Sequence, residues 1–263
     1  MRIINIDNQD SAPCIPATGV GVTCRRDGGP HARHNASPAA GVFFCPAGAA
    51  TEPRIPMSSI DLDRINAELG HNAQGLVDWA IGLGQPAIVT TNFRPFEAVI
   101  LHMCTRARPD IPVVWMDNGY NTEATYRFAD EVTRQLGLNL RIYLPLRSRA
   151  HREAVEGPTP ALDDPRHAAF TQEVKLEPFA RALRETAPKV WFTALRATDT
   201  AVRAQMDPVS LNPDGLVKVA PLLHWSSKDL YEYCQAHGLP NNFDYVDPTK
   251  GEDNRECGLH LAH

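Results

Sequence analysis

The chain has 263 residues, of which 43% are hydrophobic and 22% charged, and its formal net charge is −5. This composition is ordinary for a globular domain and excludes disorder throughout, while the net negative charge gives no electrostatic basis for binding nucleic acid or an anionic membrane surface. No apolar stretch approaches the roughly 18 residues of a membrane span, and no secretory signal stands at the N-terminus, so we expect a cytoplasmic protein.

The first 56 residues differ in composition from the rest of the chain. They are rich in Gly, Pro, Ala and Ser and show no sustained apolar period, which is typical of a disordered leader. Met57 is an alternative start, and Ser58 and Ser59 are candidate caps for a helix over 60–69. We therefore predict a leader over 1–56, a folded domain over 57–240 and a C-terminal arm over 241–263.

Helical and extended patterns alternate from residue 73 onward, which predicts an α/β fold with a mainly parallel sheet. Strands are predicted over 87–91, 112–116, 139–144, 189–194 and 216–223. Helices are predicted over 73–82, 95–106, 122–136, 177–186 and 227–237. Pro95 suits a first helical turn, and Gly238 suits a helix stop. Residues 147–172 are predicted as a connecting excursion, with helix in its second half as an option.

Polar segments follow three of the predicted strands, at the sheet edge where open α/β folds bind ligands. The first consists of Thr90, Thr91, Asn92, Phe93 and Arg94, whose hydroxyls and backbone N–H groups can face a phosphate or sulfate. Because the glycines of the Walker and dinucleotide patterns are absent, a polar turn without a ligand is the alternative.

The second and third segments add a turn and two arginines. Asp117, Asn118 and Gly119 form a sequence that tight turns favour. Arg196 and Arg203 lie in the third segment, where their guanidinium groups can bind an oxyanion. Lys175 is a further candidate cation, and solvated surface charge is the alternative for all three.

The six cysteines include no C-x-x-C pair, so the sequence has no obvious ligand set for an iron-sulfur cluster. Cys104 and Cys234 lie within helical patterns and are predicted to be buried. Cys257 stands between Arg255 and His260 near the end of the chain, where a thiolate would be stabilised and could reach a reagent. On this spacing alone, a nucleophile and an incidental surface cysteine are both open.

Several segments taken in order resemble one family, the phosphoadenosine phosphosulfate (PAPS) reductases of the sulfonucleotide reductase group. The most specific segment is RECGLH at 255–260, followed by DNGYNTEATYRF at 117–128, KLEPFARAL at 175–183 and TTNFRPFEAVILHM at 90–103. The resemblance implies an adenine nucleotide α-hydrolase-like fold, with a doubly wound, mostly parallel five-stranded sheet. It also implies a flexible C-terminal arm that closes over the nucleotide.

The same resemblance implies roles for particular residues. Residues 90–94 match the phosphosulfate-binding loop, 116–119 match the motif beside the adenosine, and Lys175 matches a lysine near the sulfate. Arg196 and Arg203 match nucleotide-binding arginines. Cys257 matches the catalytic cysteine, with His260 and Arg255 beside it to stabilise the thiolate. The cysteine pair that precedes Lys175 in cluster-containing adenosine phosphosulfate (APS) reductases is absent, which favours the branch without a cluster or metal.

The implied reaction is the reduction of PAPS to sulfite and adenosine 3′,5′-bisphosphate in sulfate assimilation. It passes through a cysteine S-sulfonate and uses thioredoxin or glutaredoxin as the electron donor, and the family is often dimeric. The serine-rich loop is replaced by residues 90–94, the usual threonine by Asn118 and an arginine by Ala197. The arm is also short, because only residues 252–254 stand between GLPNNFDYVDPTKG at 238–251 and RECGLH. A cluster-free APS reductase and a non-catalytic nucleotide-binding protein therefore stay open. An ATP-cleaving pyrophosphatase would need a Ser-Gly-Gly-x-Asp-Ser loop, which this chain lacks.

Overall fold

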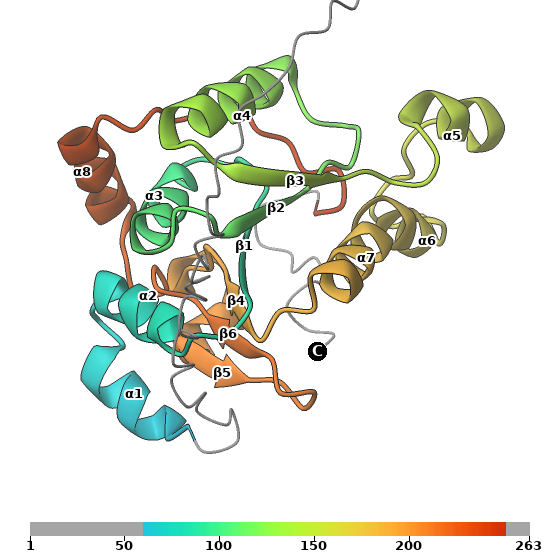
Figure 1. The fold of residues 1–263 in the computed structure, drawn as a ribbon. Coiled ribbons are helices and arrows are strands. Elements are labelled where there is room, and N and C mark those ends of the chain that lie inside the picture. The colour runs from blue at the N-terminus through green and yellow to red at the C-terminus, as the bar shows by residue number, and fades with distance from the viewer. Residues whose placement is uncertain (1–59, 251–263) are drawn as a thin grey trace, which may run out of the picture. The chain divides into compact units, whose positions relative to one another are not determined.

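A computed structural model of the chain describes residues 60–250, which form a six-stranded sheet with helices on both faces (Figure 1). The predicted leader, its alternative start at Met57 and the catalytic candidates Cys257, His260 and Arg255 lie outside the described residues. Ser58 and Ser59 lie outside them too, and Asp61 caps the first helix by accepting a hydrogen bond from the backbone N–H of Arg64.

The sheet has the strand order β3-β2-β1-β4-β6-β5, and all neighbours are parallel except β5 and β6. The strands are β1 (Ala87–Thr91), β2 (Pro112–Met116), β3 (Asn139–Tyr143), β4 (Val190–Phe192), β5 (Val209–Leu211) and β6 (Val217–Val219). The chain runs outward from β1 to β3 and then returns to β4 on the other side of β1. The strand order therefore reverses between β1 and β4, which is where doubly wound sheets bind ligands.

The alternation of side chains along the central strands builds two cores. Val89 and Val113 face the core that is covered by α1, α2, α3, α4 and α8, whereas Ile88 and Val114 face a smaller core that includes Phe179 of α7. Successive strand residues point to opposite faces, and β1 and β2 are covered on both. This explains why β2 and the first three residues of β1 are apolar.

The helices largely follow the predicted pattern. They are α1 (Leu62–Leu69), α2 (Ala73–Gly82), α3 (Ala98–Ala107), α4 (Glu123–Leu136), α5 (Arg149–Glu156), α6 (His167–Thr171), α7 (Glu177–Thr186) and α8 (Ser227–His237). A π-helix, η2 (Gln172–Leu176), joins α6 to α7, and two 3₁₀ turns, η3 (Ala197–Asp199) and η4 (Arg203–Gln205), follow β4. Gly238 ends α8 in the left-handed conformation, with φ of 60°, as glycines after helices commonly do.

Three expectations about the fold are wrong in detail. The sheet has a sixth strand, β5, whose backbone is also bound by the side chain of Asn66 in α1 through both the N–H and the carbonyl of Val209. The helix expected from Pro95 begins at Ala98, because Phe96 has a φ of 66° and interrupts helical geometry. The connecting excursion is helical in its first half as well, in α5.

Residues 241–250, the start of the predicted arm, are held against the domain. The amide of Asn242 donates to the hydroxyl of Thr125 in α4, and the carbonyl of Asp244 accepts from the hydroxyls of Thr122 and Thr125. Asn242, Asp247 and Thr249 are buried. We call residues 241–250 the strap.

Candidate functional site

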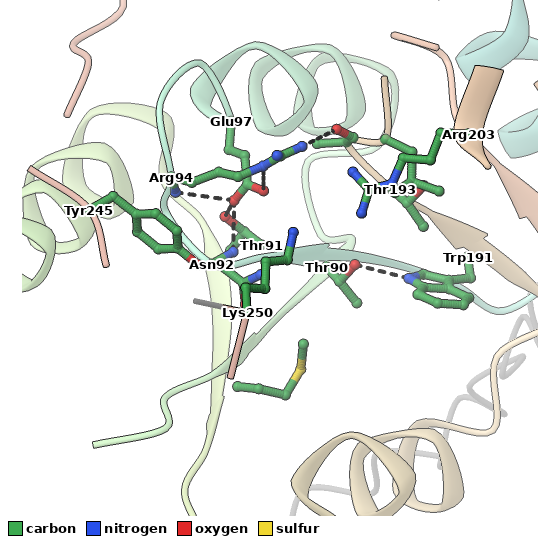
Figure 2. Close-up of a pocket in the computed structure, with 13 residues that line it drawn as sticks. Thr90, Thr91, Asn92, Arg94, Glu97, Trp191, Thr193, Arg203, Tyr245 and Lys250 are labelled. Carbon is green, nitrogen blue, oxygen red and sulfur yellow. Dashed lines mark hydrogen bonds and ion pairs between the residues drawn. The ribbon is translucent and has the colours of Figure 1, made fainter. Parts of the chain in front are cut away.

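The loop after β1 and the segment after β4 line a pocket with two residues of the strap (Figure 2). Tyr245 and Lys250 lie on one side of this pocket, and Trp191, Thr193 and Arg203 lie on the other. A larger neighbouring cleft of about 680 Å³ shares Arg94, Tyr245 and Lys250 with it. A volume of this size falls within the range of roughly 300–1,000 Å³ that is common for small-molecule sites.

The β1 loop is organised around the buried carboxylate of Glu97. One oxygen, Oε2, accepts hydrogen bonds from the hydroxyl of Thr91 at 2.8 Å and the backbone N–H of Asn92 at 2.7 Å. The other, Oε1, pairs with Nε of Arg94 at 2.9 Å. Glu97 therefore takes the backbone donor of Asn92 and caps the loop before α3, where we expected a ligand anion to be bound.

Four of the five predicted loop residues line the pocket, and Phe93 does not. Its side chain is fully buried and packs edge-on against Trp115 and Phe128. Phe93 has a φ of 54°, a left-handed conformation that costs a non-glycine residue energy. Burial of the Phe93 side chain offsets that cost and fixes the loop to the hydrophobic core.

Asp199 brings three arginines together beside the pocket. Its carboxylate oxygens lie 3.1 Å from Nη1 of Arg94, 2.8 Å from Nη2 of Arg196 and 2.9 Å from Nη1 of Arg203. Burial opposes the ionisation of Asp199, but the three guanidinium groups outweigh it and lower its pKa. The Asp199 carboxylate is therefore charged at neutral pH and fixes the positions of the arginines.

The cationic side chains of the two cavities outnumber the carboxylates. Four cations line them, namely Arg94, Arg196, Arg203 and Lys250, against the three carboxylates of Glu97, Asp199 and Asp247. Asp247 is itself paired with Lys175 outside the lining. The hydroxyl of Thr193 also lines the pocket, is buried, and has no hydrogen-bond partner within 60–250. An anionic ligand would meet both the excess charge and this free donor.

Lys175 lies in η2 and is held by the strap. Its ammonium is 2.5 Å from Oδ2 of Asp247 and donates to the hydroxyl of Thr249 at 3.1 Å, and only 2% of the residue is exposed. Burial raises the pKa of Asp247, but the Lys175 charge and the hydrogen bonds outweigh this and the pKa is lowered. Lys175 thus ties the strap to η2 and does not line either cavity.

The predicted turn after β2 is built as a turn and lies outside the lining of both cavities. Oδ1 of Asp117 accepts from the backbone N–H of Gly119, the amide of Asn121 and the hydroxyl of Tyr126. Oδ1 of Asn118 accepts from the N–H of Tyr120. Met116, immediately before the turn, does line the smaller pocket.

The structure therefore gathers part of the predicted site. Thr90, Thr91, Asn92, Arg94, Arg196 and Arg203 line the two cavities. Phe93, Asp117, Asn118, Gly119 and Lys175 do not. The sequence analysis missed Glu97, Thr193, Tyr245, Asp247 and Lys250 as site residues. A signal for Glu97 was its place three residues after Arg94, since acidic residues stabilise helix starts.

Substitution of Glu97 by alanine is expected to destabilise the domain by about 2–4 kcal/mol, because buried donors in the loop would lose their acceptor. Glu97→Gln keeps an acceptor oxygen and should lose less. The unfolding midpoint in urea measures both changes. Equal midpoints for the wild-type protein and Glu97→Ala would show that the loop does not depend on this carboxylate.

Cys104 and Cys234 are buried, as the sequence predicted. Burial raises the pKa of the Cys234 thiol to about 11, and raises that of Cys104 further. Neither thiol is therefore reactive at neutral pH. Among residues 60–250, no group of three or more His, Cys, Asp or Glu side chains is arranged to hold a metal ion. None of the described helices is long and apolar enough to cross a membrane.

A doubly wound sheet with arginine-rich loops where its strand order reverses defines an α/β protein of the nucleotide-binding class. Residues 86–243 match the family model of the phosphoadenosine phosphosulfate reductase domain. The chain belongs to the PAPS reductase family.

Individual relatives agree with this assignment. Phosphoadenosine 5′-phosphosulfate reductase of Synechococcus sp. is 36% identical over 235 residues, which cover 79% of this chain and 100% of the relative. The protein of the same name from Xanthomonas axonopodis pv. citri is 41% identical over 194 residues, which cover 71% of this chain and 80% of the relative.

A solved structure has a similar fold. The crystal structure of PAPS reductase from Candida auris in a phosphate complex aligns with a TM-score of 0.60 and 22% identity, over 69% of this chain and 87% of that chain. The predicted fold class, adenine nucleotide α-hydrolase-like with a mostly parallel sheet, is confirmed, with six strands in place of five.

Proposed function

We propose that this protein reduces PAPS to sulfite and adenosine 3′,5′-bisphosphate in sulfate assimilation, as the names of its relatives indicate. One structural observation carries the proposal: Tyr245 and Lys250 of the strap line the same pocket as the β1 loop and Arg203. Cys257 follows Lys250 by seven residues. An extended chain covers about 3.3–3.6 Å per residue, so Cys257 is within reach of a ligand in that pocket.

In the first step, the thiolate of Cys257 attacks the sulfonate sulfur of the nucleotide. A sulfur–sulfur bond forms, the bond between sulfur and the phosphate oxygen breaks, and the nucleotide leaves as the phosphate anion. Arg255 and His260 stabilise the thiolate. Arg94, Arg196, Arg203 and Lys250 offset the charge that moves onto the leaving phosphate.

In the second step, a thiolate of reduced thioredoxin or glutaredoxin attacks the Cys257 sulfur and releases sulfite. The resulting mixed disulfide is resolved by the donor's second thiol, which returns Cys257 to its reduced form and leaves the donor oxidised. The donor supplies both electrons. The buried free thiols of Cys104 and Cys234 fit a reducing, cytoplasmic compartment.

We propose different roles for Lys175 and for the turn formed by Asp117, Asn118 and Gly119. The turn at 117–119 follows β2, next to β1, and would lie beside an adenosine bound over the sheet edge. Lys175 acts through the strap, because its ammonium is held by Asp247 and Thr249. We assign it the role of positioning the root of the arm that carries Cys257.

Reduction of APS is the second candidate. The residues that match the phosphosulfate-binding loop, of which Thr90, Thr91, Asn92 and Arg94 line the pocket, would meet the same phosphosulfate group in APS and in PAPS and do not distinguish the two nucleotides.

The test incubates the reduced protein with PAPS or with APS in the absence of any electron donor. We expect the intact mass to rise by one sulfonate group, located on Cys257 by peptide mapping, with the competent nucleotide only. Addition of reduced thioredoxin should then remove the adduct and release sulfite. Nucleotide binding without an adduct from either compound would favour a non-catalytic nucleotide-binding protein.

A further inference from the structure

We propose a second oxyanion-binding site, in the pocket between α5 and α6, with Arg152 at its floor. Figure 1 shows α6 next to α7 and α5 farther out, in the segment that connects β3 to α7. The proposed ligand is a small anion with two oxygens on one edge, namely a carboxylate, sulfate or phosphate. The proposal concerns residues that the proposed reduction does not use.

The guanidinium of Arg152 is buried without the partners that such burial normally requires. The residue is 3% exposed, yet its Nε and Nη2 atoms have no hydrogen-bond partner in the described part of the chain. Its Nη1 atom faces Glu156 at 3.7 Å, too far for a good hydrogen bond. Buried charged groups are otherwise paired or hydrogen-bonded.

The two unpartnered atoms form one edge of the guanidinium group. Nε and Nη2 present parallel N–H bonds, the arrangement that binds two oxygens of a carboxylate or phosphate at once. The group also lies over the Phe170 ring, with its central carbon 4.5 Å from the ring centre. The edge is therefore held in a fixed orientation and lacks only an acceptor.

Arg152 also lines a cavity of about 330 Å³. Its lining combines three arginines, two glutamates and a small apolar surface, contributed by Arg147, Arg152, Glu156, Pro158, Pro160, Arg166, Ala169, Phe170 and Glu173. None of these residues lines the two cavities of the candidate functional site. The pocket is a separate site.

The carboxylates around the cavity are bound mainly by arginines other than Arg152. Arg147 binds both glutamates of the lining, Glu156 at 2.5 Å and Glu173 at 2.6 Å, and Arg166 pairs with Asp164. With Asp164 counted, three arginines meet three carboxylates, so the cluster carries no net charge. An anion bound by Arg152 would therefore be held by the two unpartnered donors and not by excess charge.

The experiment follows the Nε–H resonance of Arg152 by ¹⁵N NMR in the full-length protein. Adenosine 3′,5′-bisphosphate is kept at saturation to fill the candidate functional site. Sodium sulfate, phosphate and acetate are titrated separately, with sodium chloride holding the ionic strength constant. We expect a saturable shift of the Arg152 resonance with at least one of the three anions and none with chloride alone. Comparison of the shifts caused by sulfate and phosphate with the shift caused by acetate distinguishes tetrahedral from planar ligands.

Two variants are used to assign the Arg152 resonance and to test its response to anions. Arg152→Lys keeps the charge but loses the two-donor edge, so affinity should fall by at least about tenfold. Arg127→Lys, at an exposed arginine paired with Glu123, is the matched control and should bind as the wild-type protein does. If the Arg152 resonance of the wild-type protein shows no saturable shift with any of the three anions, the proposal is wrong, whether or not Arg152→Lys folds.

Discussion

Replacement of Cys257 by serine is expected to lower sulfite release by at least about 10³-fold, since removal of a catalytic nucleophile commonly costs this much or more. A serine hydroxyl is almost entirely protonated at neutral pH, and no base for it is part of the proposed mechanism. The variant should also acquire no sulfonate mass with PAPS or APS. Sulfite release is measured with reduced thioredoxin at saturating nucleotide.

A measurement of nucleotide binding shows whether the variant is inactive because it lacks the nucleophile or because it is unfolded. The cavity residues lie within 60–250, so Cys257→Ser should bind adenosine 3′,5′-bisphosphate within about twofold of the wild-type affinity, well below the tenfold that corresponds to 1.4 kcal/mol. Cys24→Ser is the matched control, because the sequence assigns the leader no function, and it should react normally. A fully active Cys257→Ser variant would show that another residue is the nucleophile. It would also remove the evidence that the C-terminal arm enters the pocket during the reaction.

Local patterns predicted the central strands because burial on both faces leaves a mostly apolar run in the sequence. Strands 87–91 and 112–116 were predicted with the bounds the structure gives. Strand β5 was missed because it has three residues, of which Leu211 is exposed, and it depends on pairing with β6 and on Asn66. Helix α5 was missed for a similar reason: only Arg152 of its eight residues is buried.

The parts of the site that follow from the order of the strands could be predicted from the sequence. The parts that depend on ion pairs between distant residues could not. The loops after β1 and β4 had to meet, since parallel strands on either side of the reversal end at one edge. Pairing of Arg94 with Asp199 joins residues 105 positions apart, and that of Lys175 with Asp247 joins residues 72 positions apart. No periodicity in the sequence encodes such pairs. The sequence therefore identified the three arginines and Lys175, but it missed Lys250 and the carboxylates of Glu97 and Asp247.

The buried pair of Lys175 and Asp247 gives the second large expected effect. Asp247→Asn should destabilise the domain by about 3–5 kcal/mol, because the substitution leaves the Lys175 ammonium buried without a counter-charge. Asparagine can still accept hydrogen bonds from the backbone N–H and hydroxyl of Thr249, as Oδ1 of Asp247 does. The expected loss of stability is therefore due to the missing negative charge at residue 247. Urea unfolding at pH 7 measures it, and Glu232→Gln, which breaks the exposed pair with Lys228, is the matched control that should leave the midpoint unchanged.

The pH dependence gives an independent check with a defined sign. The pKa of Asp247 is lowered in the folded protein, so its contribution to stability is complete above the unfolded pKa of about 3.9 and is lost as pH falls through the folded value. Wild-type stability should therefore fall more steeply than that of Asp247→Asn in this acid range.

A double variant separates the structural role of Lys175 from a direct role in catalysis. Lys175→Met with Asp247→Asn removes the uncompensated charge and should recover much of the stability lost in Asp247→Asn. If Lys175 acts only by holding the strap, sulfite release by the double variant should recover with stability. Recovered stability together with sulfite release still reduced by about 10²-fold or more, the scale of a lost electrostatic contact in the transition state, would instead place the Lys175 ammonium at the sulfate during turnover.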